Sequence, residues 1–196
     1  MQKVLRQEFP SAVSWTDLIE RTASHLANCG FTKANTLAAN VICRDEINRR
    51  NVDSFSEYWG ANFELAGLGG YPSGGVTAFN AYKSHVPEGG NLLILFGPHF
   101  GVSKEGELAA VEREGRSGLT TACGSVLGFL NRLNSEPDYT PEYSRIDAEQ
   151  HLVESALLAK RDEFIDRPRP KKAVTEAMYW VIHETIDAIL EAIEFN

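Results

Sequence analysis

The sequence has few cysteines, few basic residues and no long hydrophobic run. Its 3 cysteines, Cys29, Cys43 and Cys123, are too few, and odd in number, for a disulfide framework. Lysine and arginine number 19 against 27 aspartates and glutamates, and the net charge of −8 argues against nucleic acid or an anionic membrane as a partner, because phosphate binding needs a basic surface. The longest apolar run, Leu92–Phe96, is far shorter than the roughly 20 residues that span a bilayer.

The sequence also shows no targeting segment. Its N-terminal stretch carries Glu8, Asp17 and Glu20 and has no apolar core, so no secretory signal is visible. Apolar residues make up 43% of the chain and charged residues 23%, which is typical of a globular protein. We therefore expect a cytoplasmic protein. In that reducing compartment, cysteines serve as buried apolar residues, catalytic groups or metal ligands.

Apolar periodicity and turn residues predict helices that alternate with strands. Helical spacing predicts a helix in residues 14–31. The unbroken apolar content of Leu92–Phe96 predicts a strand covered on both faces, as in a parallel sheet, and another strand is expected at Leu37–Cys43. Further expected elements are a short apolar run at 63–68, a short helix at 77–84, a helix at 106–114, an apolar segment at 126–133, and C-terminal helices at 147–164 and 173–195.

This order of elements predicts an α/β fold with a mainly parallel β-sheet flanked by helices and with helices at the C-terminus. A length of 196 residues fits a single domain, residues 1–196. Within it we expect an N-terminal helical segment at 1–34, a core that carries the functional site at 35–133, and C-terminal helices at 145–196.

Three residues with metal-binding side chains lie at or just past the ends of candidate strands: Cys43, His99 and Cys123. The functional crevice of an open α/β sheet lies at those carboxyl ends. Two thiolates and one imidazole suit Zn²⁺, and three protein ligands leave a fourth position open. The sequence contains no CxxC or HxxxH pair. Three widely spaced ligands therefore favour a catalytic zinc site over a structural one.

Two charged residues follow the first of these cysteines. Asp45 lies two positions beyond Cys43, and alternate residues at the end of a strand point the same way, so its carboxylate can approach the open position of the metal. There it would accept the proton of a water and orient its lone pair. Arg44 is expected to keep Asp45 ionised, because a guanidinium stays charged at any working pH.

Over about residues 35–130, the sequence resembles the limiting CO₂-inducible protein B/C family. The matching strings occur in the same order as in that family, and in this order they are quite specific. They are Cys43-Arg-Asp-Glu-Ile47, Tyr58-Trp59-Gly60, Leu65-Ala-Gly-Leu-Gly-Gly70, Pro72-Ser-Gly-Gly75, Thr77, His85-Val-Pro87, Gly97-Pro-His-Phe-Gly101, Gly106, Arg113-Glu-Gly115 and Ala122-Cys-Gly124.

That family is similar to the β-carbonic anhydrases in fold and site. The resemblance implies reversible hydration of CO₂ to bicarbonate, a homodimer, and a zinc ion held by two cysteines and one histidine. Carried over by position, the ligands are Cys43, His99 and Cys123, and the acidic partner of the zinc water is Asp45.

The sequence departs from the wider β-carbonic anhydrase pattern in two places. Those enzymes have Cys-x-Asp-x-Arg, whereas position 47 is isoleucine here. Their second pair is His-x-x-Cys, whereas the candidate histidine and second cysteine are far apart in this chain. The arginine that pairs with Asp45 is therefore expected to be Arg44, Arg49 or Arg50, with Arg44 preferred.

Other readings of the same residues are weaker. The three ligands would otherwise be two buried thiols and a loop histidine. His85 is a rival ligand, but it precedes the strand rather than following it, and Cys29 is expected to be a filler at a helix end. The glycine-rich run at 67–75 lacks both GxGxxG and GK[ST], which excludes a phosphate loop. His183-Glu184 lacks the second histidine of HExxH, because Asp187 stands in its place.

These observations predict a zinc carbonic anhydrase. The alternative is a non-catalytic zinc protein of the same fold that senses CO₂ or bicarbonate or belongs to a complex, and a third hypothesis is zinc-dependent hydrolysis of another small electrophile. A zinc deaminase is excluded, because the chain lacks H-x-E and C-x-x-C. Whether Asp45 ligates the metal in a resting form stays open. So does the role of the aromatic set, which would be either core packing or an apolar wall for CO₂: Phe55, Tyr58, Trp59 and Phe63.

Overall fold

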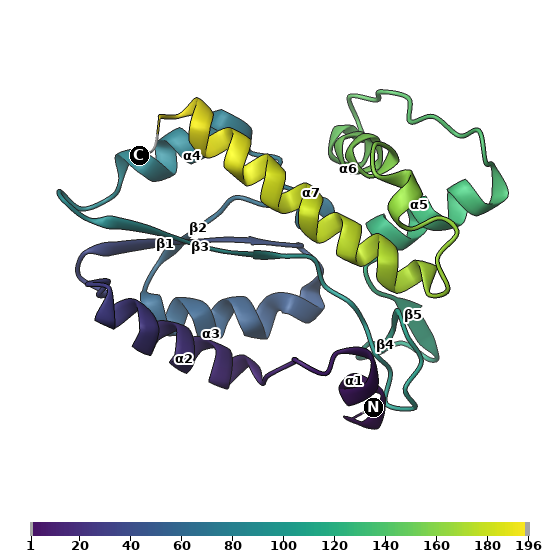
Figure 1. Cartoon of the computed structure of the whole chain (residues 1–196), viewed down its shortest axis with the longest axis horizontal. Coiled ribbons are helices and arrows are strands. Elements are labelled where there is room, and N and C mark those ends of the chain that lie inside the picture. Colours follow the sequence, from purple (N-terminus) through teal and green to yellow (C-terminus); the bar gives the residue numbers. More distant parts are fainter. Residues whose placement is uncertain (1, 195–196) are drawn as a thin grey trace.

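A parallel β-sheet with helices on both faces forms the centre of the molecule (Figure 1) in the computed structural model, which describes residues 2–194. The predicted α/β class is confirmed. The strands are β1 (Thr36–Ile42), β2 (Asn62–Glu64), β3 (Asn91–Gly97), β4 (Ala110–Glu112) and β5 (Leu119–Thr121). The helices are α1 (Gln2–Glu8), α2 (Trp15–Asn28), α3 (Arg49–Trp59), α4 (Gly75–Ser84), α5 (Gly124–Ser135), α6 (Ala148–Leu158) and α7 (Pro170–Ala192), with short 3-10 helices η1 (Glu46–Asn48), η2 (Leu68–Gly70) and η3 (Arg161–Glu163).

The parallel sheet has the strand order β2-β1-β3, and its register sets the position of the site. Thr36 of β1 pairs with Asn91 of β3, and Ile42 pairs with Gly97, so the two strands begin and end at the same level. The residues that follow β1 and β3 therefore emerge side by side at the carboxyl edge of the sheet. Strands β4 and β5 form a separate antiparallel pair, in which Ala110 faces Thr121.

The apolar residues of β3 alternate between the two faces of the sheet, as the pleat requires. Leu92, Ile94 and Phe96 pack against the larger buried cluster, which lies toward α4, α5 and α7. Leu93 and Leu95 pack against a smaller cluster on the opposite face. That smaller cluster consists of Ala23 of α2, Ala38 of β1, and Phe55 and Trp59 of α3. Because both faces are covered, the continuous apolar run of β3 is explained.

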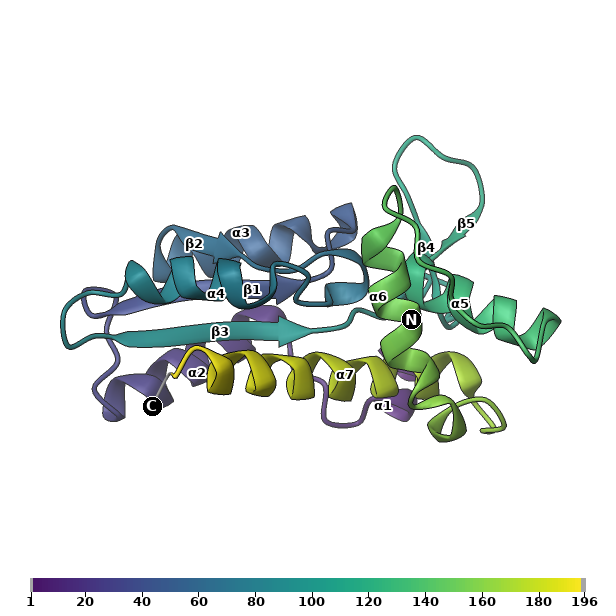
Figure 2. The same cartoon turned by 90° about the horizontal axis from the view of Figure 1, so that it is seen from above.

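The longest helix, α7, connects two parts of the molecule. It lies along β3 for much of its length and continues to α5 and α6 (Figure 2), and it packs against β3, α4, α5 and α6. Its buried face includes Val174, Met178, Ile182 and Ile186 at helical spacing. No helix within residues 2–194 is long and apolar enough to cross a membrane.

Three local expectations are wrong or incomplete. The helix expected at 106–114 is instead strand β4 and its turns, because Gly106 and Ala109 have positive φ angles of 92° and 62°, which no helix accommodates. The helix expected at 147–164 ends at Leu158 and is followed by η3. The apolar pattern does not predict α3, whose buried residues are a single pair four positions apart, Phe55 and Trp59. The predicted end of the last helix at Phe195, and the domain limits at residues 1 and 196, lie outside the described residues.

Candidate metal centre

The three expected ligands converge at the carboxyl edge of the parallel sheet. Cys43 directly follows β1, His99 lies two residues past β3, and Cys123 is the N-cap residue of α5, two positions past β5. Their ligand atoms all lie within 4.8 Å of one another, and the two sulfurs are 3.8 Å apart. Within residues 2–194 this is the one group of three or more such side chains that can hold a metal ion.

The chemistry of this group fits a metal. Cys43 and Cys123 are buried, with 5% and 3% of their surfaces exposed. His99 Nε2 is also buried and has no hydrogen-bond partner. A buried polar atom without a partner is costly, and a metal ion would satisfy it together with the two sulfurs. These three residues are therefore a matched set of donors for a borderline-soft cation such as zinc.

Asn48 restrains two of the three candidate ligands from one position. Its Nδ2 donates to the carbonyl oxygen of Cys43 at 3.0 Å and lies 3.1 Å from His99 Nδ1. Nε2 makes no hydrogen bond and is the ring nitrogen left for a metal. Binding there leaves the ring proton on Nδ1, so the Asn48 amide would have to present its oxygen to that proton. The sequence reasoning missed Asn48. Its only signal is its place between a candidate ligand and a helix, which many structural asparagines share.

Asp45 pairs with Arg113, and not with Arg44. Arg113 Nη1 donates to Asp45 Oδ1 at 2.8 Å and Nη2 donates to Oδ2 at 2.9 Å, a bidentate pair. Arg113 also binds Glu46, and its Nε donates to Thr120 Oγ1 at 2.8 Å. The expectation for Arg44 is therefore corrected. Neighbouring residues of an extended chain point in opposite directions, so Arg44 cannot share the side of Asp45.

The other two arginines considered from the sequence are also not partners of Asp45. Arg49 pairs with Asp53 at 2.9 Å and with Glu64 at 4.0 Å. Arg50 is exposed on α3. Arg44 donates from Nε to the carbonyl oxygen of Ala66 at 3.1 Å, on the opposite side of the strand end. The sequence marks Arg113 only as part of the Arg113-Glu-Gly115 string. That string cannot by itself show a contact with Asp45, which is 68 positions away.

The arginine pair sets the charge of Asp45. Burial raises the pKa of this carboxyl, but the hydrogen bonds from Arg113, together with smaller contributions from Glu46, the Ile47 N–H and His99, outweigh burial and lower the pKa to about 2. The same bonds raise the pKa of Arg113 above its ordinary value. Asp45 is thus a carboxylate at any physiological pH. Its Oδ2 lies 3.8 Å from His99 Nε2, beside the candidate metal position.

The two sulfurs, 3.8 Å apart, shift the pKa of each other in opposite directions. The hydrogen bond from the Cys123 thiol lowers the pKa of Cys43, and the same contact raises the pKa of Cys123. A cation held between the two sulfurs would favour the thiolate form of both, because a cysteine binds metal only when deprotonated.

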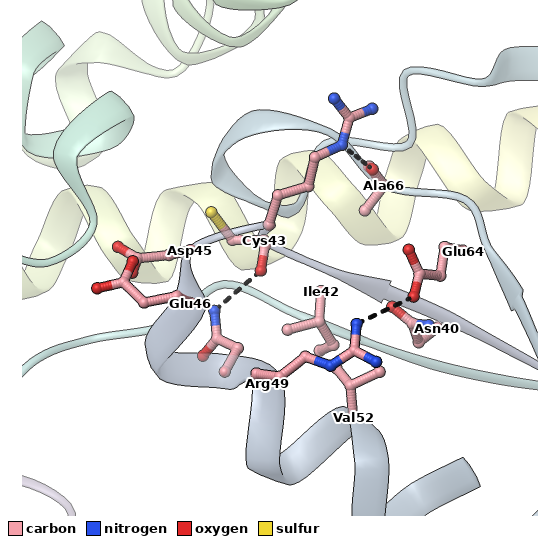
Figure 3. Close-up of a pocket in the computed structure, with 11 residues that line it drawn as sticks. Asn40, Ile42, Cys43, Asp45, Glu46, Arg49, Val52, Glu64 and Ala66 are labelled. Carbon is pink, nitrogen blue, oxygen red and sulfur yellow. Dashed lines mark hydrogen bonds and ion pairs between the residues drawn. The ribbon is translucent and has the colours of Figure 1, made fainter.

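A cavity of about 350 Å³ opens beside Cys43 and Asp45. Figure 3 shows Asp45 and Glu46 at one end of it and Glu64 beside Arg49 at the other. Its apolar wall contains Ile42, Val52 and Ala66. The cavity therefore combines an apolar surface with charged groups at its rim.

The remaining residues considered from the sequence lie elsewhere. His85 ends α4 and lies 2.6 Å from the carbonyl oxygen of Ala81 through Nδ1. His183 pairs with Asp187 on α7 at 3.1 Å, and Cys29 is exposed at the end of α2. The aromatic set serves packing rather than an apolar wall at the site: Phe55 and Trp59 are buried in the smaller cluster, Tyr58 contacts Trp59, and Phe63 contacts Tyr82.

Comparison with known proteins identifies the family. The family model described as limiting CO₂-inducible proteins B/C beta carbonic anhydrases matches residues 12–195. The chain belongs to this family. The match covers nearly all of the chain, more than the resemblance of its central motifs over residues 35–130 suggests. No curated protein sequence matches the chain.

Solved structures of the family have the same fold. The crystal structure of PtLCIB4, described as a homolog of the limiting CO₂-inducible protein LCIB, is 29% identical, covers 98% of this chain and 80% of its own, and has a TM-score of 0.92. The crystal structure of LCIB itself is 24% identical, covers 96% of this chain and 79% of its own, and has a TM-score of 0.78. The second likeness shows the fold alone.

Proposed function

We propose that this protein is a zinc-dependent carbonic anhydrase that catalyses the reversible hydration of CO₂ to bicarbonate. The observation that carries the proposal is the convergence of Cys43, His99 and Cys123 beside an ionised Asp45, in a chain of this family. Two sulfurs and one imidazole leave a fourth position of a tetrahedral metal for water or substrate.

Zinc, when bound, would lower the pKa of a water ligand and so supply a nucleophile for CO₂ at neutral pH. The protein's part is to keep that position open and oriented. Asp45 is bound at both oxygens by Arg113, so it remains an acceptor and does not take up a proton itself. Its Oδ2 stands beside the centre and can accept a hydrogen bond there, which would direct a lone pair toward the substrate.

The cavity beside Asp45 supports CO₂ as the substrate. CO₂ is small and uncharged, and the wall formed by Ile42, Val52 and Ala66 can hold it without hydrogen bonds. In this proposal Arg113 takes the role that the sequence reasoning gave to Arg44. Arg113 acts through Asp45, which makes it a positioning residue.

A second candidate function is a non-catalytic protein that binds zinc and bicarbonate. The observation in its favour is the short distance of 3.8 Å between Asp45 Oδ2 and His99 Nε2, which brings the carboxylate close enough to occupy the fourth position. A centre closed in that way would hold metal without turning over substrate.

Stopped-flow CO₂ hydration with a pH indicator separates the two functions. We expect the zinc-loaded protein to accelerate hydration, Cys43→Ser to match the buffer rate, and Cys29→Ser to match the wild type, because Cys29 is exposed and distant from the centre. A wild type that contains one zinc per chain and does not exceed the buffer rate would exclude the enzyme.

We also propose, from the family resemblance, a cytoplasmic homodimer. The dimer would have a mass of about 43 kDa, twice the 21.7 kDa of one chain. Size-exclusion chromatography with light scattering measures this directly, and a mass near that of one chain would contradict it.

A further inference from the structure

Glu149, in the first turn of α6, reaches the rim of the cavity from a distant part of the chain. Its Oε1 accepts hydrogen bonds from Arg44 Nη2 at 2.9 Å and from Ser73 Oγ at 3.0 Å. Its Oε2 accepts one from the backbone N–H of Leu68 at 3.4 Å. One carboxylate thus connects Arg44, next to a candidate metal ligand, to the turn at residues 67–73.

The turn is built closely around this carboxylate. A Cβ atom on Gly67 would lie 2.6 Å from Glu149 Oε2 and 2.6 Å from Ser73 Oγ, so a side chain there would displace one or both of these groups. The absence of a side chain at Gly67 therefore lets the Glu149 carboxylate approach the turn this closely. The position of Glu149 is a specific feature of this turn rather than a chance surface contact.

Arg44 differs from the other arginine that lines the cavity. Arg49 lies between two carboxylates, Asp53 at 2.9 Å and Glu64 at 4.0 Å. Arg44 uses Nε for the Ala66 carbonyl and Nη2 for Glu149, and its Nη1 has no hydrogen bond to any residue in the range 2–194. Arg44 thus pairs with one carboxylate and keeps a free donor, whereas Arg49 lies between two carboxylates.

The cavity needs such a cation if it handles bicarbonate. CO₂ is uncharged, but bicarbonate is an anion, and the chain carries a net charge of −8. The cavity itself is lined by the carboxylates of Asp45, Glu46 and Glu64. An anion entering it meets repulsion unless a positive group lies at the rim. A guanidinium matches the planar oxygens of bicarbonate better than a point charge does.

We propose that Arg44 binds bicarbonate at the rim of the cavity and that Glu149 is the positioning residue that holds Arg44 there. This inference rests on the proposed function for its ligand, although it also applies to a non-catalytic bicarbonate protein. The side chain of Arg44 is 62% exposed, so without Glu149 it keeps one hydrogen bond to a neutral carbonyl and moves into solvent. A pre-positioned guanidinium loses less conformational freedom when it binds the anion.

The first test measures binding rather than turnover. The ¹⁵N-labelled zinc-loaded protein is titrated with sodium bicarbonate at constant pH and ionic strength, and amide shifts give the dissociation constant. We expect Arg44→Gln to weaken bicarbonate binding about tenfold, the loss typical of a charge-assisted hydrogen bond. The matched control Arg49→Gln, at an arginine that lies between two carboxylates rather than beside one, should change binding less than about twofold.

Variants of Glu149 test the positioning role. Glu149→Gln should weaken binding about threefold, which is the scale of a partly exposed ion pair. The double variant Arg44→Gln/Glu149→Gln should bind like Arg44→Gln alone, because Glu149 acts only through Arg44. Gly67→Ala, which displaces the same carboxylate, should reproduce Glu149→Gln. Unchanged zinc content and amide dispersion show that each variant is folded.

Kinetics provide the readout that a purely structural role would not move. In the dehydration direction, Glu149→Gln should raise the KM for bicarbonate more than it lowers kcat. Wild-type affinity in Arg44→Gln, tighter binding in Glu149→Gln, or additive losses in the double variant would each overturn the inference. If Arg44 carries bicarbonate binding but no hydration occurs, the enzyme proposal fails and this one stands. If hydration occurs and Arg44→Gln binds normally, only this one fails.

Discussion

The candidate centre lies between two regions that supply its residues in different ways. The parallel sheet delivers Cys43 and His99 from neighbouring strands whose ends are level in the register. The β4–β5 hairpin and the start of α5 deliver Arg113 and Cys123. The hairpin is not part of the parallel sheet. Two backbone hydrogen bonds at Gly101 join the residues that flank it to the loop after His99: the Gly101 N–H donates to the Ala122 carbonyl oxygen at 3.2 Å, and the Ala109 N–H donates to the Gly101 carbonyl oxygen at 2.8 Å. The comparison shows that the site depends on the docking of two regions, not on the sheet alone.

The largest effect should come from removing one ligand on each side. We expect Cys43→Ser, from the sheet, and Cys123→Ser, from the hairpin region, each to lower zinc content at least about tenfold, because three protein ligands leave no spare donor. Elemental analysis of the purified proteins measures this, with Cys29→Ser as the control. Retention of zinc by Cys123→Ser would show that the sheet alone makes the centre.

Removing the hairpin's arginine should reduce activity strongly. We expect Arg113→Met to lower kcat/KM for CO₂ hydration about 10²-fold, because Asp45 loses the partner that orients its carboxylate and keeps it ionised. Arg50→Met, at an exposed arginine of α3, is the control and should keep the wild-type rate. Stopped-flow assays at matched zinc content measure both. Equal rates for the two variants would show that the sheet region orients Asp45 without Arg113.

The same ion pair predicts how acid affects the metal-free protein. The folded-state pKa of Asp45 is lowered to about 2, so its stabilisation is fully present above the ordinary value of 3.8 and is lost as the pH falls toward 2. The Asp45 side chain is 12% exposed, so the pair is only weakly screened. Between about pH 5 and pH 3, the excess unfolding free energy of wild type over Asp45→Asn should fall by about 1 kcal/mol. Urea unfolding in chelator measures this, and a constant difference would exclude a lowered pKa.

The smallest effect should come from the support behind Arg113. Thr120→Val removes the hydroxyl that accepts from Arg113 Nε at 2.8 Å and makes a longer bond of 3.3 Å to the Val111 carbonyl oxygen, but it preserves the shape and the β propensity of the residue. Loss of one such bond corresponds to about 1 kcal/mol, so we expect kcat/KM to fall by about fivefold. Thr121→Val in the same strand is the control. A larger loss than that of Arg113→Met would contradict the order of dependence between these residues.

The sequence was informative where local pattern decides the structure. The apolar runs of β1 and β3 predict parallel strands, and the chemistry of cysteine and histidine at their ends predicts the ligand set, which then converges as expected. The hairpin was missed, because residues 106–114 contain apolar residues at helical spacing, and only the positive φ angles at Gly106 and Ala109 show that the chain turns there.

That single error explains the wrong partner for Asp45. With residues 106–114 treated as a helix, nothing brings Arg113 near Asp45, and the nearest arginine in sequence, Arg44, is the natural choice. The contact between Arg113 and Asp45 spans 68 positions and depends on how the hairpin docks, which no local pattern encodes. Asn48 and Glu149 were missed for the same reason, since their roles are defined only by tertiary contacts.

The length of α7 has a mechanical consequence for the boundary between the sheet and the hairpin region, where the centre lies. One unbroken helix of 23 residues packs on β3 and α4 and also on α5 and α6, so it holds the sheet and the region that carries Cys123 together. A protease cut in the exposed tip at residues 114–118 would sever the backbone between His99 and Cys123 without releasing either fragment. The two pieces would remain associated through the packing of α7, and the ligands would keep their positions in the cleaved protein.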